Sequence, residues 1–252
     1  MPLSSIQVGD EIQVMDTETG QFKYSEVLLF LDRNPELFRD YLLIETSSGK
    51  KIQVTPSHLI VAIKNSELID NSVKSSNNNN KSINSYTRTE ENNNYENEVT
   101  SDTREKVFDS SFGITFESQI IFASQIEIGD SVITTDGDRH LIDKVINVKN
   151  SRDQGVYAPL TAEGTVVIND VVASCYAVVN SHSLAHFVYG PLRLYHNFEL
   201  SFKRLWESMF KPFLVVKHSQ ERSTAKIGIH WYANFLYDLA EYVLPSSLLY
   251  PS

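Results

Sequence analysis

The sequence contains a single cysteine, Cys175, in 252 residues. An internal disulfide and a zinc site made of several cysteines are therefore excluded. Basic residues are in the minority, with 22 Lys and Arg against 32 Asp and Glu and a formal net charge of −10. Because no basic cluster is present to neutralise phosphates, we expect no nucleic-acid partner. The sequence has no apolar run of membrane-spanning length, and we expect no signal peptide in this chain.

Short strands separated by turns dominate the sequence on both sides of a polar segment. Apolar and polar residues alternate in residues 11–14 and 51–54, and glycine-containing turns bound these runs. The same pattern returns later in the chain. The sequence therefore predicts a mostly β fold, with one β domain formed by residues 1–64 and 116–180.

The two β-rich parts also resemble each other. Ile-Gln-Val-Gly-Asp-Glu-Ile at residues 6–12 is echoed by Ile-Glu-Ile-Gly-Asp-Ser-Val at residues 126–132. The glycine-led strand at residues 49–55 has a counterpart at residues 164–170. A repeat of hairpins in one order predicts two halves packed about a pseudo-two-fold axis, each too small to be stable alone. Chance similarity between short strands is the alternative.

Two further regions differ in composition from the β domain. Residues 65–115 are rich in Asn, Ser, Thr and Glu and poor in large apolar residues, which predicts a disordered insertion. In residues 181–252, large apolar residues recur at helical spacing, and Pro245 ends the last predicted helix. An aromatic-rich amphipathic tail of this kind docks on its own domain, binds a lipid, or lies in a membrane interface.

Three places in the β domain carry residues suited to chemistry. The string Thr55-Pro56-Ser57-His58 follows a predicted strand, where an imidazole can exchange a proton near neutral pH and a threonine can fix it or a carbonyl. A structural histidine is the alternative. Cys175 is either a small core residue or a reactive thiol. Asp32 either pairs with Arg33 or a backbone amide, or lies in an apolar pocket with a raised pKa.

His182 and His186 are spaced to share one helix face, as metal ligands do. No acidic residue or third imidazole accompanies them in the sequence. We therefore expect no metal site.

The motifs taken together resemble the autoprocessing domain of the Hedgehog family. The resemblance is carried, in that family's order, by YSEVLLFLDR at residues 24–33, TPSHL at 55–59, YAPLT at 157–161 and ASCYAV at 173–178. The tail, from residue 228 to residue 245, is similar to the end of insect-type members. The resemblance implies a Hint-type β domain, formed by a duplication, followed by a helical sterol-recognition tail at residues 181–252.

The resemblance also implies a self-directed reaction. A Gly-Cys peptide bond at the head of the module becomes a thioester, and cholesterol then takes the upstream signalling fragment from the sulfur. His58 matches the proton donor to the departing amine, and Thr55 matches the residue that positions the scissile amide. Asp32 matches the residue thought to activate the sterol hydroxyl. Cys175 matches a second cysteine close to the nucleophile.

Further expectations follow from the same resemblance. No cofactor is implied, since cholesterol is a co-substrate, and Trp231, Phe235 and Leu239 are the candidate sterol-binding residues. The implied partners are cholesterol, the upstream signalling domain in cis, and a membrane interface contacted by the tail. The implied location is the secretory pathway, through the endoplasmic reticulum and Golgi, with a secreted precursor.

One departure from the family pattern affects activity. Family members begin this module with Cys-Phe ahead of the Pro-Leu that matches Pro2 and Leu3, whereas here no cysteine precedes Cys175. We expect the chain as written to be inactive, either because it is truncated or because catalysis has been lost. A non-catalytic sterol- or lipid-binding module is thus the alternative function, and an intein-like splicing element is a third.

Overall fold

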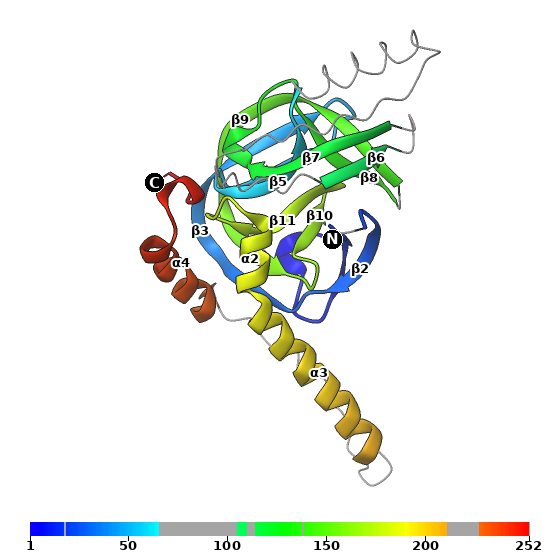
Figure 1. Ribbon diagram of the computed structural model, residues 1–252, viewed down its shortest axis with the longest axis vertical. Helices are drawn as coiled ribbons and strands as arrows, with labels where there is room; N and C mark the ends of the chain where they lie inside the picture. The colour runs from blue at the N-terminus through cyan, green and yellow to red at the C-terminus, as the bar shows by residue number, and fades with distance from the viewer. Residues whose placement is uncertain (18, 66–104, 110–113, 138, 211–226, 252) are drawn as a thin grey trace, which may run out of the picture.

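The computed structural model describes the chain except for residues 18, 66–104, 110–113, 138, 211–226 and 252 (Figure 1). Its first part contains η1 (Leu3–Ser5), β1 (Glu11–Met15), β2 (Phe22–Glu26), β3 (Leu29–Thr46), β4 (Lys51–Val54) and β5 (His58–Ile63). Its second part contains β6 (Glu105–Asp109), β7 (Ile114–Phe122), η2 (Ala123–Gln125), β8 (Ser131–Asp136), β9 (Arg139–Leu160), β10 (Thr165–Ile168) and β11 (Val171–Ala177). The tail contains α2 (His182–Val188), α3 (Gly190–Phe210), β12 (Gly228–Ile229), α4 (Trp231–Val243) and η3 (Ser246–Leu248). The predicted fold class, mostly β with a helical tail, is confirmed.

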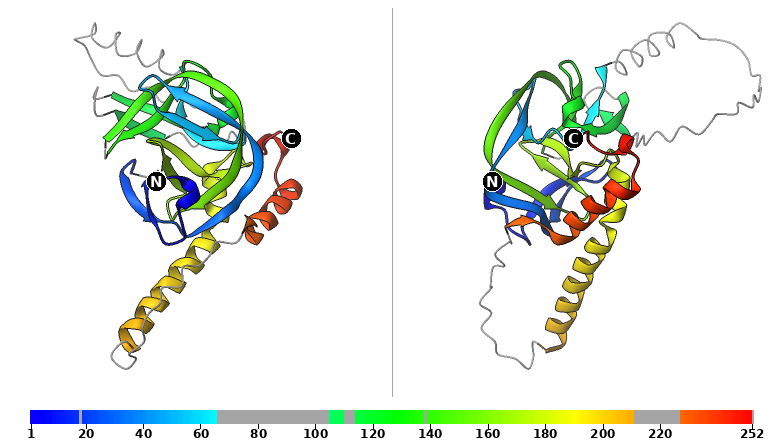
Figure 2. Two further views of the ribbon diagram at one scale, coloured as in Figure 1. Left: turned by 180° about the vertical axis from the view of Figure 1, so that it is seen from behind. Right: turned by 90° about the vertical axis from the view of Figure 1, so that its left-hand side faces the viewer.

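The longest strands, β3 and β9, pair antiparallel along most of their length, from Leu29 opposite Leu160 to Thr46 opposite Val145. They run side by side as a curved band around the β body (Figures 1 and 2). The main sheet has the order β12-β3-β9-β8-β11-β5-β7-β6, so β5 of the first part lies between strands β11 and β7 of the second, and β3 pairs with β9 of the second. This interleaving is why neither half could keep its own core without the other.

The predicted duplication is confirmed in the backbone hydrogen bonds. The Gly9 amide donates to the Val27 carbonyl at 2.9 Å, and the Gly129 amide donates to the Val145 carbonyl at the same distance. Both glycines have a positive φ, 93° and 103°, which a residue with a Cβ rarely adopts. The repeated Gly-Asp therefore marks one turn that is built twice.

A carboxylate closes each of these repeated turns. Asp10 accepts from the Gln7 amide at 2.8 Å, and Asp130 accepts from the Glu127 amide at 2.9 Å. Side-chain acceptance by an Asp within its own turn is a local interaction that short sequence strings encode. This is why the repeat was visible in the sequence.

The core lies between the two halves and draws on strands of both. Fully buried members come from β1, β4, β5, β8 and β11, including Val14, Ile52, Ile60, Val132 and Val171. The inner strand β5 is buried at every position after His58. His58 is thus the last position before the chain enters the interior.

The boundary predicted for the polar insertion needs correction. Strand β6 lies within residues 65–115, and pairs with β7 from Glu105 opposite Ser118 to Asp109 opposite Ile114. The Lys-Val-Phe run at residues 106–108 has the residue types of a strand, and β7 offers it a free edge. Sheet structure therefore begins about ten residues before the predicted boundary, and the prediction for residues 66–104 lies outside the described residues.

The tail is joined to the β domain by sheet pairing as well as by packing. Strand β12 pairs with β3, placing Gly228 opposite Arg33 and Ile229 opposite Asp32. Helix α4 follows at once, capped by His230, whose Nδ1 accepts from the Tyr232 amide at 3.3 Å. In Figures 1 and 2, α4 lies along the outer side of β3 while α3 projects away from the body. No helix in the described part of the chain is long and apolar enough to cross a membrane.

Candidate functional site

The candidate catalytic histidine sits at the end of a tight turn. Residues 55–58 link β4 to β5, and the His58 amide donates to the Thr55 carbonyl at 2.9 Å. Pro56 occupies the second position of this turn, which its fixed φ favours. The Pro56 carbonyl accepts from the Ser124 amide at 3.0 Å, which ties the turn to η2. The positions of Thr55 and His58 are therefore fixed by a short turn, and the Pro that favours this turn is visible in the sequence.

The His58 side chain reaches across to the other half of the duplication. Its Nε2 lies 2.7 Å from the carbonyl oxygen of Ser174 on β11. Because a carbonyl only accepts, Nε2 carries the hydrogen and Nδ1 is left with its lone pair. Burial lowers the pKa of His58, and the hydrogen bond with the Ser174 carbonyl partly offsets this effect. The imidazole is therefore neutral at pH 7.

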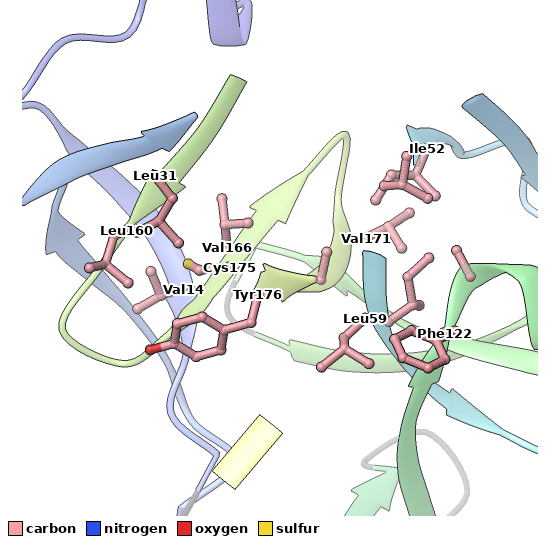
Figure 3. Packing of buried hydrophobic residues seen from close by; sticks show 14 of the residues in the cluster. Val14, Leu31, Ile52, Leu59, Phe122, Leu160, Val166, Val171, Cys175 and Tyr176 are labelled. Carbon is pink, nitrogen blue, oxygen red and sulfur yellow. The ribbon is translucent and has the colours of Figure 1, made fainter. Parts of the chain in front are cut away.

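Cys175 follows Ser174 but faces the opposite way. Its side chain is 3% exposed and belongs to the main hydrophobic cluster, where Figure 3 shows it beside Val14, Leu31 and Val166. Its Sγ lies 3.6 Å from the Thr161 hydroxyl. Burial raises the pKa of the thiol to about 11, against a lowering effect of the Thr161 hydrogen bonds. Cys175 is a neutral thiol in the core at neutral pH.

Strained backbone follows β11 at the same point. Val178 has φ 75°, a conformation that β-branched residues avoid, and the Val179 amide donates to the Ala177 carbonyl around it at 2.9 Å. The Val178 amide donates to the Ser57 carbonyl at 3.0 Å, and its carbonyl accepts from the Tyr250 amide at 2.7 Å. The candidate turn and the C-terminal segment therefore hold Val178 in this conformation between them.

Asp32 lies on β3, beside the entry of the tail. It is opposite Ile229 of β12 and Ala158 of β9. Burial raises the pKa of Asp32, while the charge of Arg39 and the backbone amide of Arg33 act in the opposite direction. Of the alternatives for Asp32, the backbone amide of Arg33 and burial that raises the pKa both apply, and no ion pair with Arg33 is found among the described residues.

Arg33 is engaged elsewhere, which explains why it does not neutralise Asp32. Its guanidinium donates to the carbonyls of Ile6 at 2.8 Å and of Ser4 at 3.3 Å. The same group lies 4.6 Å from the centre of the Phe30 ring. Arg33 therefore fastens the N-terminal segment to β3.

The structure brings His58 close to Cys175 through one peptide group, but it does not link Asp32 to either. Among the described residues, no hydrogen bond or ion pair joins the Asp32 carboxyl to His58 or Cys175. Burial raises the pKa of Tyr237 on α4, and the charge of Asp32 raises it further. Asp32 thus lies on the part of β3 that pairs with the tail.

Helices of the tail enclose a large cleft. It has a volume of about 1270 Å³ and is lined by α2, the start of α3, α4 and the segments around residues 16 and 163. Phe235 and Leu239, two of the predicted sterol-binding residues, line it together with Leu236. Trp231, the third, is 71% exposed and is not among its lining residues.

A polar network under this cleft was not evident in the sequence. Ser174 Oγ lies 2.9 Å from His182 Nδ1, and the Tyr176 hydroxyl lies 2.9 Å from His186 Nδ1. Arg193 donates to the Tyr176 hydroxyl at 2.8 Å. The spacing of the two histidines predicted a shared helix face, which is observed, but their partners come from β11 and α3. Within the described residues, no group of three or more His, Cys, Asp or Glu could hold a metal ion.

Comparison with known proteins extends over nearly the whole chain. Residues 1–245 match the family described as the Hint module. The chain is similar to "Protein hedgehog" of Drosophila yakuba, with 34% identity over 248 residues that cover 98% of this chain and 42% of that protein. It is similar to the Drosophila melanogaster protein at 34% identity, covering 98% of this chain and 41% of that one. The chain thus spans about two-fifths of the length of these relatives.

Solved structures with related arrangements include inteins. The crystal structure of the PabCDC21-1 intein shows 15% identity and a TM-score of 0.36, covering 65% of this chain and 68% of that one. A DnaB intein from Synechocystis sp. PCC 6803 shows 9% identity and a TM-score of 0.41, covering 68% of this chain and 82% of that one.

Proposed function

Since this chain belongs to the Hint module family, and is homologous to hedgehog proteins over 98% of its length, we propose that it is the autoprocessing part of a hedgehog-type precursor. In this proposal the thiol of an upstream cysteine attacks the preceding peptide carbonyl, and the C–N bond breaks to leave a thioester. The 3-hydroxyl of cholesterol then attacks the thioester, which releases the sulfur and leaves the signalling fragment as a sterol ester. No cofactor takes part.

The observation that carries the proposal is the contact of His58 with the Ser174 carbonyl. It places an imidazole of one half against the backbone of the other half, at the centre of the duplicated domain. A neutral imidazole can take the thiol proton and deliver it to the departing amine nitrogen. Thr55, at the start of the same turn, is suited to orient the scissile amide by hydrogen bonding.

Asp32 is proposed as the base for the sterol hydroxyl. A sterol alcohol is a weak nucleophile, and a partly desolvated carboxylate is a stronger base than one in water. The position of Asp32 opposite Ile229 puts this base next to the start of α4, which carries the predicted sterol-binding residues. Shielding by the tail would also protect the thioester from hydrolysis.

The tail is proposed to receive cholesterol through Trp231, Phe235 and Leu239. These side chains lie on α4 and are 71%, 53% and 43% exposed, which is unusual for large apolar groups unless a ligand or partner covers them. Aromatic residues of α3, including Phe198, are exposed as well. Such helices suit a membrane interface, which we propose as the place of sterol uptake. The secretory pathway and an upstream signalling domain in cis complete the proposal.

The alternative function is a sterol- or lipid-binding module without catalysis. It is favoured because Cys175, the one cysteine of this chain, is buried and un-ionised and cannot act as the nucleophile in place of an upstream cysteine. In this alternative the cleft and α4 bind the lipid, and no thioester forms. In the main proposal, Cys175 supports the site through its packing under the Ser174 peptide.

The experiment that tests the proposal uses a precursor in which a Gly-Cys-Phe junction and an upstream segment precede Pro2. We expect cholesterol to release the upstream fragment with a mass increase of one sterol. A precursor with the junction cysteine changed to alanine is the matched control and is expected to stay intact. Sterol binding without any cleavage of the intact junction would reject the main proposal and leave the alternative.

A further inference from the structure

The cleft between α2, α3 and α4 contains two buried polar atoms without a partner. Of the polar atoms that line it in the described part of the chain, His182 Nε2 and Glu163 Oε2 are buried and make no hydrogen bond. The His182 side chain is 3% exposed. Leaving such atoms unsatisfied is costly, and in native proteins it calls for an explanation such as a ligand.

The hydrogen on His182 can be placed from its neighbours. Ser174 Oγ accepts from the Tyr176 amide at 3.0 Å, and its own hydrogen has His182 Nδ1 as acceptor at 2.9 Å. Burial, with smaller effects of His186 and Arg193, lowers the pKa of His182 to about 4, so the ring is neutral. A neutral ring that accepts at Nδ1 carries its hydrogen on Nε2. His182 therefore presents a donor to the cleft.

Glu163 presents the complementary acceptor. Its Oε1 pairs with Lys23 Nζ at 3.1 Å, while Oε2 has no partner. The carboxylate accepts only, so Oε2 needs a donor. Arg193, which also lines the cleft, donates from one Nη to Tyr176 and to His186.

Much of the remaining wall of the cleft is apolar, although Asp16, Lys23 and Arg193 also line it. Val188, Leu194, Phe235, Leu236 and Leu239 line it, and Phe235 and Leu239 are 53% and 43% exposed. The volume of about 1270 Å³ exceeds the roughly 300–1,000 Å³ that is typical of small-molecule pockets. A ligand here would combine a large apolar body with few polar atoms.

We propose that this cleft is an alcohol-binding site, in which the hydroxyl of an apolar ligand accepts from His182 Nε2 and the site also offers Glu163 Oε2 as acceptor. A hydroxyl is the simple group that both donates and accepts, so it matches one free donor and one free acceptor. The inference rests on the proposed function for the identity of the ligand, which is then a 3-hydroxysterol. It assigns the capture of the sterol to His182 and Glu163, before the hydroxyl reaches Asp32, which remains the proposed base.

The test measures displacement of a fluorescent sterol from the full 252-residue chain. The competitors are cholesterol and 5-cholestene, which lacks only the hydroxyl. We expect cholesterol to compete about tenfold better, the value of one buried hydrogen bond. Equal competition by the two sterols on the unmodified chain would overturn the proposal without any variant.

Two substitutions of His182 localise the effect. His182→Asn keeps a polar group near Nδ1 and removes Nε2. In this variant, cholesterol and 5-cholestene should compete about equally. His182→Gln places an amide donor near the position of Nε2 and should retain most of the preference, as the matched control. A preference that survives in His182→Asn, with a melting temperature showing that it is folded, would overturn the role of His182.

The outcomes also separate this inference from the proposed function. If no saturable sterol binding is seen, the site and the sterol part of the proposed function both fail. If sterol binds but the hydroxyl makes no difference, the cleft assignment alone fails. Precursor cleavage by an added thiol does not depend on the cleft, and therefore reports on the first chemical step separately.

Discussion

The imidazole of His58 and the carbonyl of Ser174 lie 2.7 Å apart, Nε2 to oxygen, and join the two duplicated halves of the domain. His58 begins β5 of the first half, and Ser174 lies on β11 of the second. The Ser174 side chain, on the same residue, contacts His182 of the tail. One residue thus touches both the candidate catalytic histidine and the candidate sterol site.

The conformation of Val178 predicts an unusual response to glycine. Its φ of 75° costs about 1–3 kcal/mol for a residue with a Cβ, and glycine would remove this cost. We expect Val178→Gly to keep or raise the free energy of unfolding, measured by urea denaturation. Val179→Gly, the matched control, should lower it by about 1 kcal/mol because Val179 has no such strain. Equal losses in both variants would contradict the strain at Val178.

Asp143 is predicted to stabilise the domain in a pH-dependent manner. Its carboxylate accepts from the hydroxyls of Thr46 at 2.6 Å and Ser47 at 2.8 Å, and from the amide and hydroxyl of Ser48. Burial raises the pKa of Asp143, but these hydrogen bonds outweigh it and the pKa is lowered overall. We expect Asp143→Asn to cost about 2 kcal/mol at pH 7.

The sign of the pH effect follows from the lowered pKa. The stabilisation by Asp143 is present above the unfolded-state pKa of about 3.9 and is lost as the pH falls through the lower folded value. Urea titrations from pH 7 to pH 3 should therefore show the difference between wild type and Asp143→Asn shrinking below about pH 4. Asp136→Asn, on an exposed surface pair with Arg139, should change stability by less than about 0.5 kcal/mol.

Cys175 is predicted to be unreactive in the folded protein. Its side chain is 3% exposed, so a thiol reagent cannot reach it. Its pKa is about 11, so the reactive thiolate is scarce at neutral pH. We expect its reaction with a chromogenic disulfide at pH 8 to be at least about 100-fold slower in the native chain than in denaturant. Rapid labelling of native protein would show that the thiol is available for chemistry.

The ionised carboxylate of Asp32 is predicted to lower the free energy of unfolding at neutral pH. Because its folded-state pKa is raised, chiefly by burial, the ionised carboxylate is disfavoured in the folded chain. That cost is present above the folded pKa and disappears as the pH falls through it. Asp32→Asn should therefore raise the melting temperature at pH 7, with a smaller effect at pH 4. A fall in melting temperature at pH 7 would contradict the absence of an ion pair.

Local signals explain what the sequence could predict. The duplicated Gly-Asp turns, the turn of residues 55–58 and the end of α4 before Pro245 all depend on residues within a few positions of each other. The structure confirms these elements. The strand β6 was missed because the polar composition around it outweighed a short Val-Phe run.

Long-range contacts explain the rest. The pairing of β12 with Asp32, the contact of Arg33 with Ile6, and the link of Ser174 to His182 all join residues whose local sequence gives no sign of the partner. Asp32 in particular has an arginine as its neighbour in sequence, and only the fold shows that this arginine is occupied elsewhere. The cleft could not be predicted for the same reason.

The most direct test of the account compares two variants of the extended precursor. His58 is assigned to thioester formation and Asp32 to the sterol alone, so cleavage is measured with an added thiol and, separately, with cholesterol. The account predicts that His58→Ala blocks both reactions, whereas Asp32→Ala spares thiol-driven cleavage and abolishes sterol transfer. Cleavage of His58→Ala by the thiol at the wild-type rate, or equal loss of both reactions in Asp32→Ala, would contradict it.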